Sequence, residues 1–163
     1  MKTLLFTFCV LLALFQTTAM LKSNDLDRLT GKKWFGTLTY LDYSTNKIEP
    51  IETRLAVTRS VKGAGIYNFL TEYPKEASHN STDEIVISRD GTQIDGETLK
   101  ERILQKDGTL RFVTTKEGSD NNKKASFRFT YVIGTSSYSR KKEVCYAGST
   151  VWFTRNDLNL KAN

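Results

Sequence analysis

The side chains that most often perform chemistry are scarce in this chain. His79 is the only histidine and lies in a polar stretch between a serine and an asparagine. A histidine there could serve as a general base or as a ligand of haem or metal, although we favour a solvated loop residue. Cys145 lies in the apolar segment 144–146, which favours a buried thiol over a reactive one. One histidine and one buried cysteine predict no zinc site.

Other catalytic patterns are also missing from the sequence. It contains no glycine-rich phosphate loop and no Gly-x-Ser-x-Gly motif. Asp42, Glu49, Glu52 and Glu72 are scattered along the chain, whereas a paired-carboxylate mechanism needs two such groups within about 5–10 Å. We therefore predict no catalytic residue, no metal site, no cofactor and no enzymatic activity.

Binding chemistry has better candidates. Arginines recur on the predicted strands, at Arg54, Arg102, Arg111, Arg128, Arg140 and Arg155. Arg128 separates two phenylalanines in the most apolar strand. If these phenylalanines face outward, Arg128 points inward and can hold a carboxylate. If they face inward, as we favour, Arg128 is solvated. Tyr40 and Tyr67 could likewise line a cavity or pack in a core, so Arg128, Tyr40 and Tyr67 are the candidate ligand-binding residues.

The elements that must position these residues are predicted to be strands. Residues 51–58 alternate apolar and polar side chains with a period of two, which is typical of a half-buried strand. Residues 125–134 show the same pattern with aromatic residues on one face. Asp90-Gly91 and Asp107-Gly108 are strong hairpin signals. We expect a short helical turn capped by Asn24 or Asp25 and ending at Leu29.

Three segments are predicted to lie outside the strands. Residues 75–82 and 116–124 are polar or charged and predict loops, and residues 156–163 predict a frayed end. The remaining pattern gives eight or nine strands with tight connections, so neighbouring strands run antiparallel. An all-β, up-and-down antiparallel barrel is the first expectation because closure removes exposed sheet edges. A β-sandwich is the alternative.

The first 19 residues differ from the rest. Lys2 precedes an apolar run from Leu4 to Phe15, and small residues follow up to Ala19. This order is that of a cleavable signal peptide, and the run is shorter than the roughly 20 residues that span a bilayer. A buried helix of the mature domain is the alternative. We expect a secreted or periplasmic single-domain protein of residues 20–163, without a membrane span. Because these residues contain one cysteine, no internal disulfide can form, and the domain must be stabilised by packing.

The charge of the chain is mildly basic, with a formal net charge of +6. The positive residues are spread along the sequence in short clusters. A nucleic-acid-binding surface would need a basic stripe with aromatic residues on one face. We therefore expect solvated lysines and no nucleic-acid partner.

The segment from Leu29 to Trp34, with Gly31 shortly before the tryptophan, resembles the start of the calycin superfamily, which includes lipocalins, fatty-acid-binding proteins and avidins. The segment Gly36–Tyr43 is similar to that of small exported barrels from Bacteroidetes-type bacteria. The resemblance implies a lipocalin-like barrel in which Trp34 plugs the closed end and Arg155, on the last strand, stacks on Trp34. The lipocalin disulfide and the avidin tryptophan pocket are absent.

Two functions are compatible with these features. The first is an exported lipocalin-like protein that binds a small apolar or amphipathic ligand in a cavity of about 300 Å³ or more. The second is a protein-binding module or inhibitor that acts through the predicted loops 75–82 and 116–124, without a small-molecule ligand. Neither the ligand nor the oligomeric state follows from the sequence.

Overall fold

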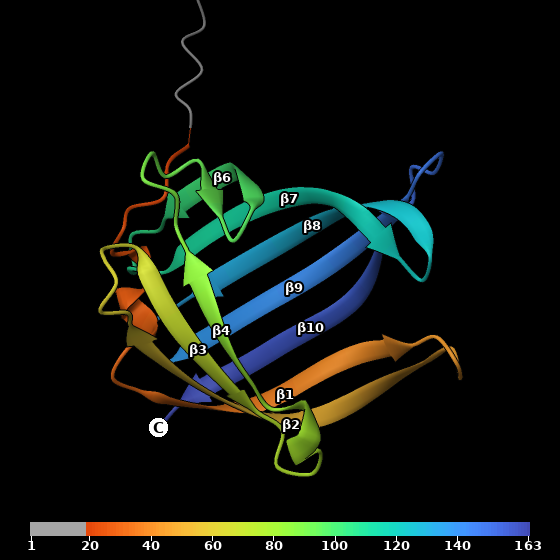
Figure 1. The fold of residues 1–163 in the computed structure, drawn as a ribbon, viewed down its shortest axis with the longest axis horizontal. Helices are drawn as coiled ribbons and strands as arrows, with labels where there is room; N and C mark the ends of the chain where they lie inside the picture. Colours follow the sequence, from red (N-terminus) through yellow and green to blue (C-terminus); the bar gives the residue numbers. More distant parts are fainter. Residues whose placement is uncertain (1–18) are drawn as a thin grey trace, which may run out of the picture.

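The chain folds into one antiparallel sheet of ten strands that curves into a nearly closed barrel (Figure 1). The structure is a computed structural model that describes residues 19–163, so the predicted signal peptide, apart from Ala19, lies outside the described residues. The strands are β1 (Lys33–Asp42), β2 (Lys47–Arg59), β3 (Ile66–Glu72), β4 (Ser81–Val86), β5 (Gln93–Ile94), β6 (Glu97–Leu104), β7 (Leu110–Asp120), β8 (Lys123–Ile133), β9 (Ser137–Tyr146) and β10 (Phe153–Ala162). Two 3₁₀ helices, η1 (Asp25–Leu29) and η2 (Ala77–His79), complete the fold.

The sheet order is that of an up-and-down barrel. It runs β4-β3-β2-β1-β10-β9-β8-β7-β6-β5, so the first and last strands of the chain pair in its middle. The two outermost strands approach each other through a single antiparallel bridge between Ile87 and Ile94. Beside it, the amide of Asp95 donates to the carbonyl of Val86 over 2.9 Å. The predicted barrel is confirmed, with slightly more strands than expected.

Two predicted irregular segments are strands in the structure. Residues 116–124 form the end of β7, a two-residue turn and the start of β8, because Asn121 and Asn122 both adopt positive φ, 46° and 61°. Two successive residues with positive φ give the tight turn that suits the twist of a hairpin. Residues 156–162 belong to β10, which pairs with β1 and β9 along its length. The predicted loop and frayed end were therefore wrong.

The inner face of the barrel carries the core. On β8, Phe127, Phe129, Tyr131 and Ile133 are buried and alternate with half-buried residues. Successive side chains of a strand point to opposite faces. Arg128 therefore lies on the outer face, where its guanidinium stacks on Trp152 and its Nε donates to Glu143 over 2.9 Å.

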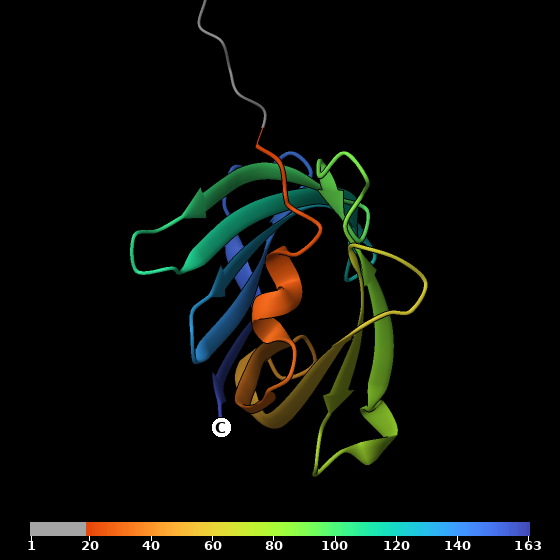
Figure 2. The ribbon, with the colours of Figure 1, turned by 90° about the vertical axis from the view of Figure 1, so that its left-hand side faces the viewer.

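The helix η1 lies across one end of the barrel, inside the ring of strands (Figure 2). Leu26 and Leu29 of η1 are buried in the core. Asp25 accepts two hydrogen bonds from the guanidinium of Arg102 on β6, 2.8 and 2.6 Å long. The predicted helical turn is confirmed, although Asn24 makes no capping hydrogen bond.

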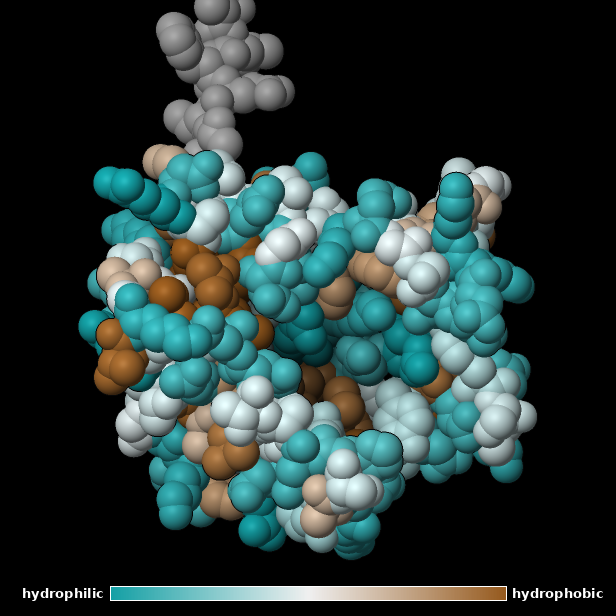
Figure 3. All heavy atoms as spheres, viewed as in Figure 1, coloured by the Kyte–Doolittle hydropathy of each residue, from teal (hydrophilic) through white to brown (hydrophobic). Residues whose placement is uncertain are grey.

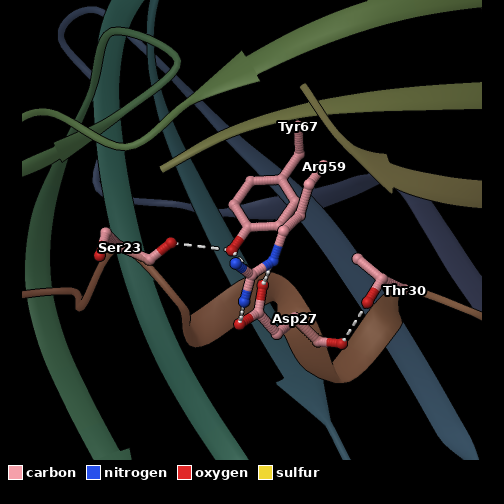
Figure 4. A network of polar contacts seen from close by, with 5 residues as sticks. All are labelled: Ser23, Asp27, Thr30, Arg59 and Tyr67. Atoms are coloured by element: carbon pink, nitrogen blue, oxygen red, sulfur yellow. Dashed lines mark hydrogen bonds and ion pairs between the residues drawn. The ribbon is translucent and has the colours of Figure 1, made fainter. Parts of the chain in front are cut away.

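A second network fixes the other side of η1 (Figure 4). Asp27 forms an ion pair with Arg59 at the end of β2. It also accepts a hydrogen bond of 2.7 Å from the hydroxyl of Tyr67 on β3, which donates to the carbonyl of Ser23 as well. These contacts and those of Asp25 tie η1 to strands on both sides of the barrel, so η1 acts as a fixed plug.

Trp34 lies at this plugged end and is fully buried, at 0% exposure. Its Nε1 donates to the carbonyl of Leu29 over 2.9 Å, and its ring meets Tyr138 edge-on. The predicted stacking of Arg155 on Trp34 is wrong. β10 continues beyond Arg155, so Ala162 is the residue that pairs with Trp34. Arg155 lies at the opposite end of the barrel, over the ring of Tyr43.

Within residues 19–163, no helix is long and apolar enough to cross a membrane.

Candidate functional site

The barrel contains a partly open cavity of about 410 Å³. The molecular face that looks toward the reader in Figure 1 is hollowed at its middle, and both hydrophilic and hydrophobic residues are visible in the hollow (Figure 3). The apolar lining comes from η1 and six strands and comprises Leu26, Leu38, Leu55, Phe69, Ile85, Ile94 and Leu158. The polar lining includes Thr71, Tyr73, Ser81, Asp83, Asp95, Tyr131, Tyr138, Arg140 and Asn156. The cavity is therefore amphipathic.

Arg140 is the positively charged group in the cavity wall. It lies on β9 between Tyr138 and Lys142 along the inner face, and 35% of its side chain is exposed. Its Nη2 donates to Oε1 of Glu97 over 2.8 Å, and its Nε donates to the hydroxyl of Tyr131 over 2.9 Å. A guanidinium has five N–H groups, so further donors remain for a ligand.

Glu97 holds Arg140 in this position. Only 3% of Glu97 is exposed, and its Oε2 accepts hydrogen bonds from the hydroxyls of Thr114 and Tyr131. A buried carboxylate is tolerated only when it is paired and hydrogen-bonded. The four side chains therefore form one network, in which every oxygen of Glu97 has a partner.

The ionisation of this network is fixed by its surroundings. Burial raises the pKa of Tyr131 well above its ordinary value, so the phenol stays protonated and can donate to Glu97. Burial alone would lower the pKa of Arg140, but the neighbouring Tyr131 and Glu97 raise it above the ordinary value. Burial also raises the pKa of Tyr138 to about 12. At neutral pH the cavity wall therefore presents a permanent cation and neutral phenols.

The rim formed by β4 and the turn between β5 and β6 has the opposite charge. Asp83 and Asp95 line the cavity and are exposed. Asp83 accepts a hydrogen bond of 2.8 Å from Ser81. Burial, and then the charge of Asp83, raise the pKa of Tyr73, which lines the cavity too. The carboxylates thus lie at the solvent side and Arg140 lies in the depth.

The cluster at the end of the barrel opposite η1 is also polar. Asp120, at the end of β7, accepts hydrogen bonds from the hydroxyls of Tyr43 and Tyr146. Arg155 at the start of β10 lies 3.6 Å from Asp120, measured between Nε and Oδ1. These contacts join the end of β1 to the end of β7, although β10, β9 and β8 lie between these two strands in the sheet.

None of the three residues predicted to bind a ligand is in the cavity lining. Arg128 lies on the outer face, as expected if its flanking phenylalanines point inward. Tyr67 is buried in the core and lines a smaller pocket of about 270 Å³ beside η1. Tyr40 is half-buried and shares the inner face of β1 with Leu38, which does line the cavity.

Neither His79 nor Cys145 lines this cavity. His79 is exposed in η2, and Cys145 is buried, with its Sγ 3.2 Å from the carbonyl oxygen of Ser149. Among residues 19–163, no cluster of three histidine, cysteine, aspartate or glutamate side chains is placed to bind a metal.

Sequence reasoning noted Arg140 among the strand arginines but did not select it. On β9, both faces are polar between Ser139 and Glu143, so alternation alone does not show which side faces inward. The sequence signal that could identify the inward face of β9 is the even spacing of Arg140 from the apolar residues Tyr138 and Val144, which places the three side chains on one face. Glu97 carried no signal beyond its place after the turn at Asp95-Gly96.

No protein-family model matches this chain, and no curated protein matches it either. The geometry of the cavity is therefore the basis for a functional assignment.

Proposed function

We propose that this chain is an exported, lipocalin-like binding protein that holds a small amphipathic molecule inside its barrel. The observation that carries the proposal is the cavity of about 410 Å³, with leucine and phenylalanine side chains on its walls and Arg140 in its depth. Ligand pockets are commonly about 300–1,000 Å³, largely apolar, with a few placed polar groups. An apolar body would pack on Leu38, Leu55 and Leu158, and a hydrogen-bond acceptor would face Arg140.

Preorganisation supports this proposal. Glu97 and Tyr131 hold two of the donors of Arg140, so its remaining N–H groups are fixed in direction before a ligand arrives. A fixed donor loses little side-chain entropy on binding. The plug η1 also closes one end of the barrel through Leu26, which gives the cavity a floor.

Export is proposed on the sequence alone. The order of Lys2, an apolar run and small residues up to Ala19 supports a cleaved signal peptide. The mature domain would then act in the periplasm or outside the cell, where a carrier or sensor of a small amphipathic molecule meets its ligand.

A cavity-filling variant tests the proposal. Leu158 lines the cavity, whereas the adjacent Asn159 is exposed on the outer face. We expect 1-octanol to bind the wild-type protein in isothermal titration calorimetry, L158W to lose this binding and the matched control N159W to keep it. Native mass spectrometry of gently purified protein should also show a co-purifying small molecule. Failure of the wild-type protein to bind 1-octanol and both of its charged analogues, octanoate and octylamine, or equal octanol binding by L158W, would overturn the proposal.

A further inference from the structure

Lys142 is a second positively charged side chain on the inner face of the barrel. It follows Arg140 by two positions on β9 and precedes the buried Val144 by two, so the three side chains share one face. Its Nζ lies 4.1 Å from the centroid of the buried Phe127 ring. Across the sheet it pairs in register with Asn156 of β10, which lines the cavity. Lys142 is not among the residues that line the cavity, but it lies directly beside two that are, Arg140 and Asn156.

The charges around Lys142 are unbalanced. The carboxylates of Asp120 and Glu97 act on Lys142 electrostatically, but each of them already pairs with an arginine. Within the described residues, no carboxylate lies at ion-pair distance from Lys142, and its amine makes no hydrogen bond. The contact with the face of Phe127 is a weaker, cation–π interaction. Lys142 is thus a half-buried cation on the inner face without a carboxylate partner.

The protonation equilibrium of Lys142 reflects this imbalance. Burial is the main reason that its pKa is lowered, and Arg155 and Arg140 lower it further, while Asp120 and Glu97 act in the opposite sense. An anion placed near Nζ would stabilise the charged amine and relieve the cost of burying it. A negatively charged ligand group near Nζ would therefore bind favourably at this position.

We infer that the interior ligand carries an anionic head group and that Lys142 is the residue that selects its charge. This inference rests on the proposed function and deepens it. Arg140 cannot make the selection alone because Glu97 neutralises it at 2.8 Å, so the pair accepts neutral and anionic acceptors alike. Lys142 adds the net positive charge that favours a carboxylate over an alcohol.

The acidic residues at the cavity rim favour a ligand of the opposite charge. Asp83 and Asp95 would attract a cationic ligand at the solvent side of the cavity. Both carboxylates are exposed, so solvent screens them more than it screens Lys142. The interior lysine should therefore dominate the choice of charge.

Three probes of equal chain length test the inference in isothermal titration calorimetry: octanoate, 1-octanol and octylamine. We expect the wild-type protein to bind octanoate about tenfold more tightly than octanol, the size of one charge-assisted hydrogen bond. K142M keeps the aliphatic stem and should lose this preference while its octanol affinity stays the same. Lys141, on the outer face and 3.4 Å from Glu143, provides the matched control: K141M should bind all three probes as the wild-type protein does.

The outcomes separate the inference from the function on which it rests. Octanol binding with no preference for octanoate, an unchanged preference in K142M, or tightest binding of octylamine would each overturn the role of Lys142 and leave the cavity as a ligand site. Failure of all three probes to bind the wild-type protein would overturn both. K142Q serves as a second variant if K142M does not give the near-ultraviolet circular dichroism of the wild-type protein, and it should lose the same preference.

Discussion

Glu97 on β6 and Arg140 on β9 form an ion pair of 2.8 Å inside the barrel, although β7 and β8 separate their strands in the sheet. The pair therefore spans the curved inner surface between strands that share no backbone hydrogen bonds. It positions the donor that faces the cavity, and it also contributes to the packing of the barrel interior. A single carboxylate thus links the stability of the fold to the geometry of the candidate site.

E97Q should be strongly destabilising. The substitution keeps the shape of the side chain but leaves the Arg140 charge without its partner and weakens the acceptor of the Thr114 and Tyr131 hydroxyls. Removing one partner of a buried ion pair typically costs about 3–5 kcal/mol. Because 35% of the Arg140 side chain is exposed, we expect a smaller loss of about 2–3 kcal/mol for E97Q. Urea denaturation followed by tryptophan fluorescence measures this loss.

The control for E97Q is E52Q. Glu52 and Arg54 form an ion pair in which both side chains are nearly half exposed, and such pairs contribute at most about 1 kcal/mol. An equal loss in the two variants would contradict the structural role assigned to Glu97.

The strand pattern of this barrel was accessible from sequence because one face of several strands is consistently apolar. Residues 51–58 and 125–134 alternate cleanly, and both are strands with that inner face buried. The predicted Asp-Gly pairs marked real turns: Asp107-Gly108, for example, joins β6 to β7, and Gly108 has a positive φ of 84°. Period-two alternation and the residue preferences of turns are local properties, so both can be recognised in the sequence without knowledge of the fold.

The candidate site was less accessible because it depends on long-range register. Arg155 was matched to Trp34 on the assumption that the last strand ends near it, whereas β10 continues to Ala162 and moves Arg155 to the other end. Arg140 and Lys142 lie on a strand that is polar on both faces. In such a strand, alternation carries no information about which side chains meet the cavity, and only the pairing of β9 with its neighbours decides it.

G36A should destabilise the junction of the first and last strands. A Cβ at Gly36 would lie 2.0 Å from the backbone oxygen of Asn159 on β10, so β1 and β10 would have to move apart. Alanine is at least as well suited as glycine to a strand, so any destabilisation must come from this clash. We expect a loss of at least about 2 kcal/mol, measured by thermal or urea unfolding.

The adjacent residue provides the comparison for G36A. Thr37 is half-buried and points to the opposite face of β1. T37A should cost less than about 1 kcal/mol. If G36A proves as stable as the wild-type protein, the close approach of β1 and β10 at this position is wrong.

D120N should loosen the end of the barrel opposite η1. The substitution removes the charge that Arg155 faces at 3.6 Å and weakens the acceptor for Tyr43 and Tyr146. The hairpin between β7 and β8 would then open more often, because fewer contacts hold its tip to β1. We expect amide hydrogen exchange in residues 118–126 to accelerate about tenfold, which corresponds to about 1.4 kcal/mol.

The tip of another hairpin gives the control for D120N. Asp107 accepts a hydrogen bond of 2.8 Å from the amide of Thr109 in the turn between β6 and β7. D107N should leave exchange in residues 118–126 unchanged. Unchanged exchange in D120N would show that Asp120 does not hold this end of the barrel closed.

The ion pair between Glu143 and Arg128 should make stability depend on pH. The hydrogen bond of 2.9 Å from Arg128 Nε is the main reason that the pKa of Glu143 lies below its ordinary value of 4.5. A carboxyl group whose pKa is lower in the folded state stabilises the fold above its unfolded pKa, and this contribution is lost as the pH falls through the folded pKa.

E143Q therefore should be less stable than the wild-type protein at neutral pH and equally stable in acid. Because 37% of Arg128 is exposed, solvent screening limits the expected difference at neutral pH to about 0.5–1 kcal/mol. Urea unfolding between pH 7 and pH values below the ordinary pKa of glutamate measures how the difference closes. A difference that stays constant over this range would mean that Glu143 acts through packing and not through its charge, since only an ionised carboxylate gains from the guanidinium of Arg128.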